Sequence, residues 1–171
     1  MKRLWTIVLL FIICVCFSNA YATAHPPIHF PKAEVLNQYT TRIPFKLVDH
    51  LIVVEAELKN KKGNFIIDTG SEALILNSVH FDIFYTFQRK SINASGVNEV
   101  LDYSYEKYID EFNLNGFKLE NKISDVINLS HIEKSKKIKL LGIIGYSILK
   151  DYEVFIDLHL NQITLSKVDK K

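Results

Sequence analysis

Short apolar segments separated by turns constrain this 171-residue chain more than any other feature. Residues 54–58 alternate between apolar and charged side chains, a period of two that is typical of a half-buried strand. Asn115-Gly116 lies between two further alternating stretches and is the strongest short signal for a β-hairpin. Helical signals are limited to a capping-box pattern at Ser130–Glu133 and one or two turns over 146–151. The sequence therefore predicts an all-β barrel or sandwich with one or two short helices.

Further turns divide the remaining apolar segments. A hairpin turn is expected at Asn60–Gly63, followed by short apolar strands at 65–67 and 74–76. Near the end of the sequence, residues 152–165 alternate on both sides of a turn over 158–161. We expect this last segment to form a closing hairpin.

The first residues have the layout of a secretory signal peptide. Lys2 and Arg3 precede an uncharged run from Leu4 to Phe17, and Ala20 and Ala22 then form an A-x-A pattern. The run is short for a membrane span, which needs about 20 apolar residues. We expect cleavage near Ala22 and a periplasmic or extracellular protein that meets the membrane only transiently through its signal peptide. A retained anchor is the alternative.

Composition narrows the chemistry of the remaining chain. Both cysteines, Cys14 and Cys16, lie in the leader, so no disulfide or thiol chemistry is expected after cleavage. The net charge of +2 equals the charge of Lys2 and Arg3, which leaves the rest formally neutral and disfavours a nucleic-acid partner. The basic run 134–139 is interpreted as a solvated face. The histidines show no metal-ligand spacing, and we expect neither a metal nor an organic cofactor.

These signals predict a simple domain organisation. Residues 1–22 form the signal peptide, and the proline-containing segment 23–42 forms an N-terminal linker. Residues 43–168 form one folded domain, and 169–171 form a short basic tail.

The main candidate for chemistry follows an apolar strand. Asn64-Phe65-Ile66-Ile67 leads directly into Asp68-Thr69-Gly70-Ser71. Burial of an unpaired carboxylate costs free energy, so an aspartate here needs hydrogen-bond partners or a function. Taken alone, the segment is also consistent with an aspartate that caps a turn at the end of a strand.

A second segment, about seventy residues downstream, adds a resemblance to a known family. Leu140-Leu141-Gly142-Ile143-Ile144-Gly145-Tyr146 is an apolar strand interrupted by glycine and followed by a short helix. With Asp68-Thr69-Gly70-Ser71 as the first motif and Ile143-Ile144-Gly145 as the second, the sequence resembles the retropepsin-like aspartic proteases over residues 43–168. It looks closest to the secreted, single-domain bacterial type.

The resemblance implies a retropepsin-like acid-protease barrel and a role for each residue of the first motif. Asp68 would be the catalytic carboxylate, and Thr69 would form a hydrogen bond across a dimer beneath the carboxylates. The Gly70 backbone N–H would donate to a carboxylate, and Ser71 would supply a side-chain hydrogen bond. The candidate flap over the substrate has Gly96-Val97 at its tip.

The family's reaction requires two carboxylates at one water molecule, which share a proton because neighbouring like charges do not both ionise easily. The chain has a single Asp-Thr-Gly, so the protease hypothesis requires a homodimer in which each chain contributes Asp68. The expected substrate is a peptide or protein. Tyr146 stands where viral members usually place an arginine that helps the dimer. The alternative is a non-catalytic envelope protein that retains the fold for binding or assembly.

Overall fold

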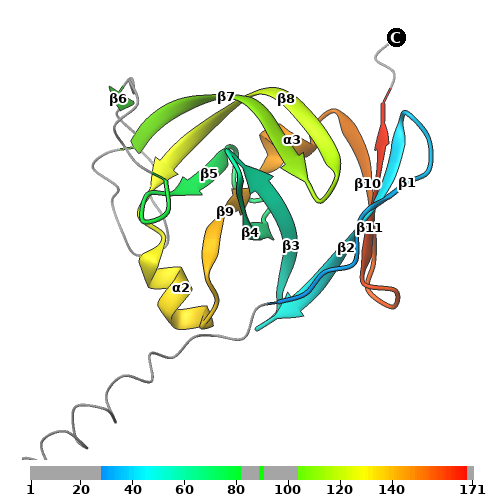
Figure 1. The fold of residues 1–171 in the computed structure, drawn as a ribbon, viewed down its shortest axis with the longest axis horizontal. Coiled ribbons are helices and arrows are strands. Elements are labelled where there is room, and N and C mark those ends of the chain that lie inside the picture. Colours follow the sequence, from blue (N-terminus) through cyan, green and yellow to red (C-terminus); the bar gives the residue numbers. More distant parts are fainter. Residues whose placement is uncertain (1–27, 82–88, 91–103, 169–171) are drawn as a thin grey trace, which may run out of the picture.

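The computed structural model describes residues 28–81, 89–90 and 104–168. This part of the chain is mostly β, with two short helices, which confirms the predicted all-β class (Figure 1). Its elements, in chain order, are β1 (Glu34–Val35), β2 (Thr40–Val48), β3 (Leu51–Leu58), β4 (Lys61–Ile67), β5 (Leu74–Asn77), β6 (Arg89–Lys90), β7 (Ser104–Leu114), β8 (Phe117–Ile127), α2 (Ser130–Lys136), β9 (Leu140–Ile144), α3 (Tyr146–Leu149), β10 (Tyr152–Asp157) and β11 (Gln162–Lys167).

A closed barrel forms the body of the molecule. Neighbouring strands follow the order β3-β4-β9-β5-β8-β7, and a further pairing of Glu57 with Asn113 joins β7 back to β3. Closure leaves these strands without a long free edge. The β4–β9 pair is parallel, whereas β5 is antiparallel to β9. Strand β9 therefore lies between the two strands that flank the Asp68 loop.

A smaller group of strands lies beside the barrel. The first half of β2 pairs with β1 and β11, and its second half pairs with β3 of the barrel. Strand β10 pairs with β11, so the predicted closing hairpin is confirmed, with its turn over 158–161. All four of these strands, β1, β2, β11 and β10, come from the same chain.

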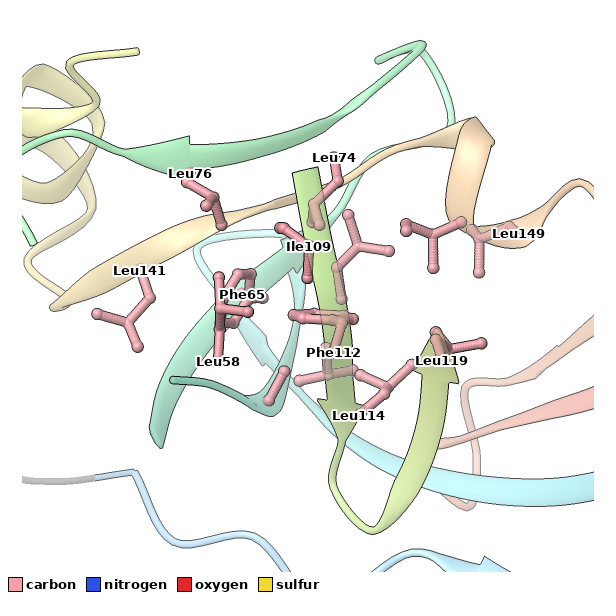
Figure 2. Packing of buried hydrophobic residues seen from close by; sticks show 14 of the residues in the cluster. Leu58, Phe65, Leu74, Leu76, Ile109, Phe112, Leu114, Leu119, Leu141 and Leu149 are labelled. Carbon is pink, nitrogen blue, oxygen red and sulfur yellow. The ribbon is translucent and has the colours of Figure 1, made fainter. Parts of the chain in front are cut away.

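The core is apolar and fills the barrel (Figure 2). Phe65 of β4 and Phe112 of β7 are fully buried and meet edge to face, with ring centroids 5.3 Å apart. Leu58, Leu74 and Leu76 are also buried around them. Because each fully buried side chain of this size contributes about 2 kcal/mol, the cluster fixes the strands that carry the candidate site.

Turns with positive φ set the strand register. Asn115 and Gly116 have φ of 49° and 103° and bring Leu114 opposite Phe117, which confirms the predicted hairpin. The hairpin expected at Asn60–Gly63 turns instead at Lys59-Asn60, with φ of 50° and 61°. A two-residue turn of this type matches the twist of the flanking strands and needs positive φ at both positions. The earlier turn leaves 61–63 in β4.

The helices differ in how well they were predicted. Helix α3 lies within the expected segment 146–151. The short helix predicted from Ser130–Glu133 is present as α2, but its capping box is wrong, because Leu129 is the N-cap residue and its side chain forms no capping hydrogen bond. The carboxylate of Glu133 instead accepts the backbone N–H of Leu140 at 2.7 Å. A contact between α2 and β9 thus replaces a contact within α2.

The segment predicted as an N-terminal linker contains regular structure. Strand β1 and the start of β2 lie within the segment 23–42 that was predicted as a linker, since Glu34 and Val35 pair with Arg42 and Thr41. The predicted signal peptide and the tail 169–171 lie outside the described residues. Within the part of the chain that the structure describes, no helix is long and apolar enough to cross a membrane.

Candidate active site

The fold brings the two sequence motifs together. Ile67, the last residue of β4, pairs in parallel with Ile144 of β9. The backbone N–H of Asp68 then donates to the carbonyl of Ile144 at 3.0 Å. Asp68-Thr69-Gly70-Ser71 and Ile143-Ile144-Gly145 therefore meet at the same end of the β4–β9 pair.

The loop after β4 turns tightly around the Asp68 carboxylate. The Gly70 N–H donates to Asp68 Oδ1 at 2.9 Å, and the Ser71 N–H donates to the Asp68 carbonyl at 3.1 Å. Asp68, Thr69 and Gly70 are exposed, and Ser71 is half-buried. The Ser71 hydroxyl donates to the carbonyl of Ala73 at 3.4 Å, which differs from a bond to the carboxylate. The loop thus presents the carboxylate to solvent with one backbone donor beside it.

The second motif holds the outer part of this loop. The backbone N–H groups of Tyr146 and Ser147 donate to the carbonyls of Ser71 and Glu72 at 2.7 and 2.8 Å. A Cβ on Gly145 would lie 2.2 Å from the Ala73 carbonyl oxygen, a distance that no side chain can occupy. A glycine is required here because two backbones approach closely. The start of α3 is thereby fixed against the Asp68 loop.

A buried polar network at the other end of β9 was not found from the sequence. Asn77 is fully buried, and its side chain donates to the Leu140 carbonyl at 2.9 Å and accepts the Leu129 N–H at 3.0 Å. Glu133 accepts the Leu140 N–H and lies 2.7 Å from Nε2 of His80. An asparagine at the end of an apolar strand was the only available signal, and its partners are distant in sequence.

The charge of the candidate site comes from the Asp68 carboxylate. Among the residues that the structure describes, no cationic side chain forms an ion pair with Asp68. The described ranges also contain no group of three histidine, cysteine, aspartate or glutamate side chains arranged to hold a metal ion. An exposed carboxylate with one N–H donor can accept a proton from water or hydrogen-bond to a ligand. One such group alone does not supply the second carboxylate that shared-proton chemistry needs.

The structure describes only some of the other predicted site residues. Gly96 and Val97, the candidate flap tip, lie outside the described residues. The cross-dimer role of Thr69 stays a prediction. Tyr146 lies at the start of α3, beside the loop that carries Asp68, and is 55% exposed.

Comparison with solved structures identifies the class of fold. No protein-family model and no curated protein matches the chain. The barrel with its two short helices has the retropepsin-like fold. It is similar to the crystal structure of a retropepsin-like aspartic protease from Rickettsia conorii, with a TM-score of 0.50 and 18% sequence identity over 75% of this chain and 90% of that chain. The predicted retropepsin-like fold is confirmed.

Proposed function

We propose that the protein is an exported aspartic endopeptidase, active as a homodimer in which each chain contributes Asp68. The observation that carries this proposal is the exposed Asp68 carboxylate, held by the Gly70 N–H at the junction of the two motifs. The retropepsin-like fold supports it, because this fold serves peptide hydrolysis in the Rickettsia protein of similar structure. The substrate would be a peptide or protein.

The reaction would use one water molecule between two carboxylates. The ionised carboxylate takes a proton from the water, and the resulting nucleophile attacks the peptide carbonyl carbon. The protonated carboxylate donates its proton to the carbonyl oxygen, and the substrate carbon becomes a tetrahedral intermediate. When the intermediate collapses and the C–N bond breaks, the carboxylate that took the water proton gives it to the leaving nitrogen, and the other carboxylate recovers its proton from a hydroxyl of the intermediate. The two apparent pKa values would belong to the carboxylate pair.

The Asp68→Asn variant tests the enzymatic role. We expect cleavage of a peptide library to fall by about a thousandfold or more, because an amide cannot act as the base. Asp110→Asn is the matched control, since Asp110 is an exposed aspartate on β7. Equal cleavage by wild type and Asp68→Asn would contradict the proposal. Sedimentation of both proteins should show a dimer.

A non-catalytic envelope protein that uses the fold for binding or assembly is the second candidate. One observation favours it: β1, β10 and β11 assemble on β2 of the same chain, so these terminal strands already have partners. By the resemblance to the retropepsin-like proteases, such strands would cover the edges by which the viral members dimerise. A strict monomer at high concentration, together with binding of peptides without cleavage, would support this second function.

A further inference from the structure

The basic run singled out in the sequence lies at the end of the molecule where α2 meets the β2–β3 turn. Lys136 of α2 forms a hydrogen-bonded ion pair with Asp49 of that turn. Lys134, Lys137 and Lys139 are exposed and form no ion pair with any residue that the structure describes. Three cationic side chains therefore project into solvent close to one another in sequence.

Exposed leucines lie at the same end. Leu47 of β2 and Leu160 of the β10–β11 turn line one groove together with Lys46 and Pro31. Leu47 and Leu160 are 52% and 60% exposed, and Leu158 in the same turn is 63% exposed. Exposed apolar residues that form one contiguous patch are typical of an interaction surface.

The N-terminal segment connects the lysines with the leucines. Ile28 and Phe30 pack against the buried cluster that contains Ile138, and Ile132 of α2 packs against the same cluster. The Phe30 ring also lies 5.8 Å from the Lys46 ammonium. In Figure 1, α2, the β2–β3 turn and the β10–β11 turn lie along the lower edge of the molecule. We call this region the basal surface, made of Lys46, Leu47, Lys134, Lys137, Lys139, Leu158 and Leu160.

The acidic groups of this region already have partners. Asp49 is paired with Lys136, whose hydrogen bond and charge lower the pKa of the carboxyl. Glu133 is bonded to His80 and to the Leu140 N–H. Asp157 accepts the backbone N–H groups of His159 and Leu160. Hydrogen bonds from N–H groups leave the charges of Glu133 and Asp157 in place, but the four lysines of the basal surface outnumber them. The basal surface is therefore net cationic as well as apolar, which complements a layer of anionic headgroups over hydrocarbon.

The preceding sequence brings a bilayer within reach. Residues 18–27 alone separate the uncharged run Leu4–Phe17 from Ile28. Ten residues span at most about 36 Å when fully extended. While the leader is in a bilayer, Ile28 and the adjacent basal surface thus stay near the headgroups. The attraction of lysines to anionic lipid acts within about one Debye length of the surface.

We propose that the basal surface docks on an anionic lipid bilayer. The lysines would contact the headgroups, and the leucines would enter the interface between headgroups and acyl chains. Strands β4 and β9 are parallel, so the end of β4 that carries Asp68 points away from Leu140 and α2. Docking would leave the Asp68 loop open to solution. This proposal does not depend on peptidase activity.

Vesicle flotation of the full chain tests the proposal. The probes are vesicles of phosphatidylcholine alone and of equal parts phosphatidylcholine and phosphatidylglycerol. Because the leader binds both, the measured quantity is the ratio of the two partition coefficients. We expect a wild-type ratio of about ten or more, and loss of most of it in Lys134→Glu/Lys137→Glu/Lys139→Glu. Lys59→Glu/Lys150→Glu/Lys167→Glu has the same net charge, alters exposed lysines elsewhere, and should keep the wild-type ratio.

A second variant set guards against misfolding and tests the leucines. If the triple glutamate variant does not fold, the corresponding triple glutamine variant should lower the ratio by a smaller factor.

In a Trp5→Phe background, Leu160→Trp carries the only tryptophan and should shift its emission to the blue with anionic vesicles. Ile123→Trp, exposed on β8, should not shift. A wild-type ratio near one, equal loss in the control lysine variant, or no shift at position 160 would overturn the proposal. Cleavage is not measured, so this failure is distinct from failure of the protease proposal.

Discussion

The polar groups at the two ends of strand β9 differ in burial and in hydrogen bonding. Where β9 begins, Asn77 is fully buried, and both its amide nitrogen and its carbonyl oxygen have backbone partners. Where β9 finishes, the Asp68 carboxylate beside it is exposed and accepts the Gly70 N–H. Asn77 ends β5 and Asp68 follows β4, the two strands that flank β9 in the barrel.

The difference separates polar groups that stabilise the fold from those that remain available for chemistry. Leaving a buried donor or acceptor without a partner costs about 1–3 kcal/mol, so the Asn77 side chain is required by its surroundings. Leaving an exposed carboxylate unpaired costs little free energy, because water solvates it. Stability should therefore depend on the Asn77 end of β9, and activity on the Asp68 end.

The largest expected effect on stability comes from Asn77→Ala. This change leaves the buried Leu129 N–H without its side-chain acceptor and removes a hydrogen bond to the Leu140 carbonyl, so the free energy of unfolding should fall by about 3 kcal/mol. Urea unfolding followed by circular dichroism measures it. Asn128→Ala is the matched control, since exposed Asn128 accepts only the Ser130 N–H, and it should cost about 0.5 kcal/mol. Asp68→Asn should change stability by less than about 0.5 kcal/mol. Similar losses in all three variants would contradict the distinction.

Gly145→Ala should have an intermediate effect. The added Cβ would lie 2.2 Å from the Ala73 carbonyl oxygen and 2.5 Å from that of Ser71, and both are backbone atoms that move only with the loop. We expect a loss of about 2 kcal/mol, comparable to overpacking of a core, together with displacement of Ser71. Thermal unfolding measures the stability. Gly116→Asn has open space around the new side chain but a φ of 103°, which L residues rarely adopt, and should cost about 1 kcal/mol. A stable Gly145→Ala with wild-type cleavage would show that this contact does not position the site.

Local patterns predicted most of the antiparallel structure. The alternation over 54–58 and the Asn115-Gly116 turn act between neighbours in sequence, and the structure has both as expected. The turn at Lys59-Asn60 was placed too late because the positive φ values could not be assigned without the strand register. The capping-box pattern failed because Glu133 bonds to Leu140, a partner outside α2.

Long-range contacts could not be predicted from residue patterns. The parallel β4–β9 pairing joins segments about 75 residues apart, and the closure of β7 on β3 rests on one residue pair. Only the family resemblance linked Asp68 with Gly145 before the structure did so. The position of Asn77 at the end of an apolar strand does not reveal its burial, because its partners come from two other segments. The flap prediction at Gly96 and the dimer stay predictions.

The smallest expected effect concerns Asp49, an exposed carboxylate that, unlike Asp68, has a cationic partner. The hydrogen bond from Lys136 and its charge lower the pKa of Asp49 below 3.8. A lowered folded-state pKa gives stability that is present above the unfolded pKa and is lost as the pH falls through the folded value. Asp49→Asn should thus lower the thermal midpoint slightly at about pH 6, and the difference should disappear as the pH falls through the folded-state pKa of Asp49. Because the pair is exposed, salt should also remove the difference. Lys136→Met should reproduce the result, whereas Asp110→Asn should not. A difference that persists at low pH or in high salt would mean that Asp49 acts through packing rather than through its charge.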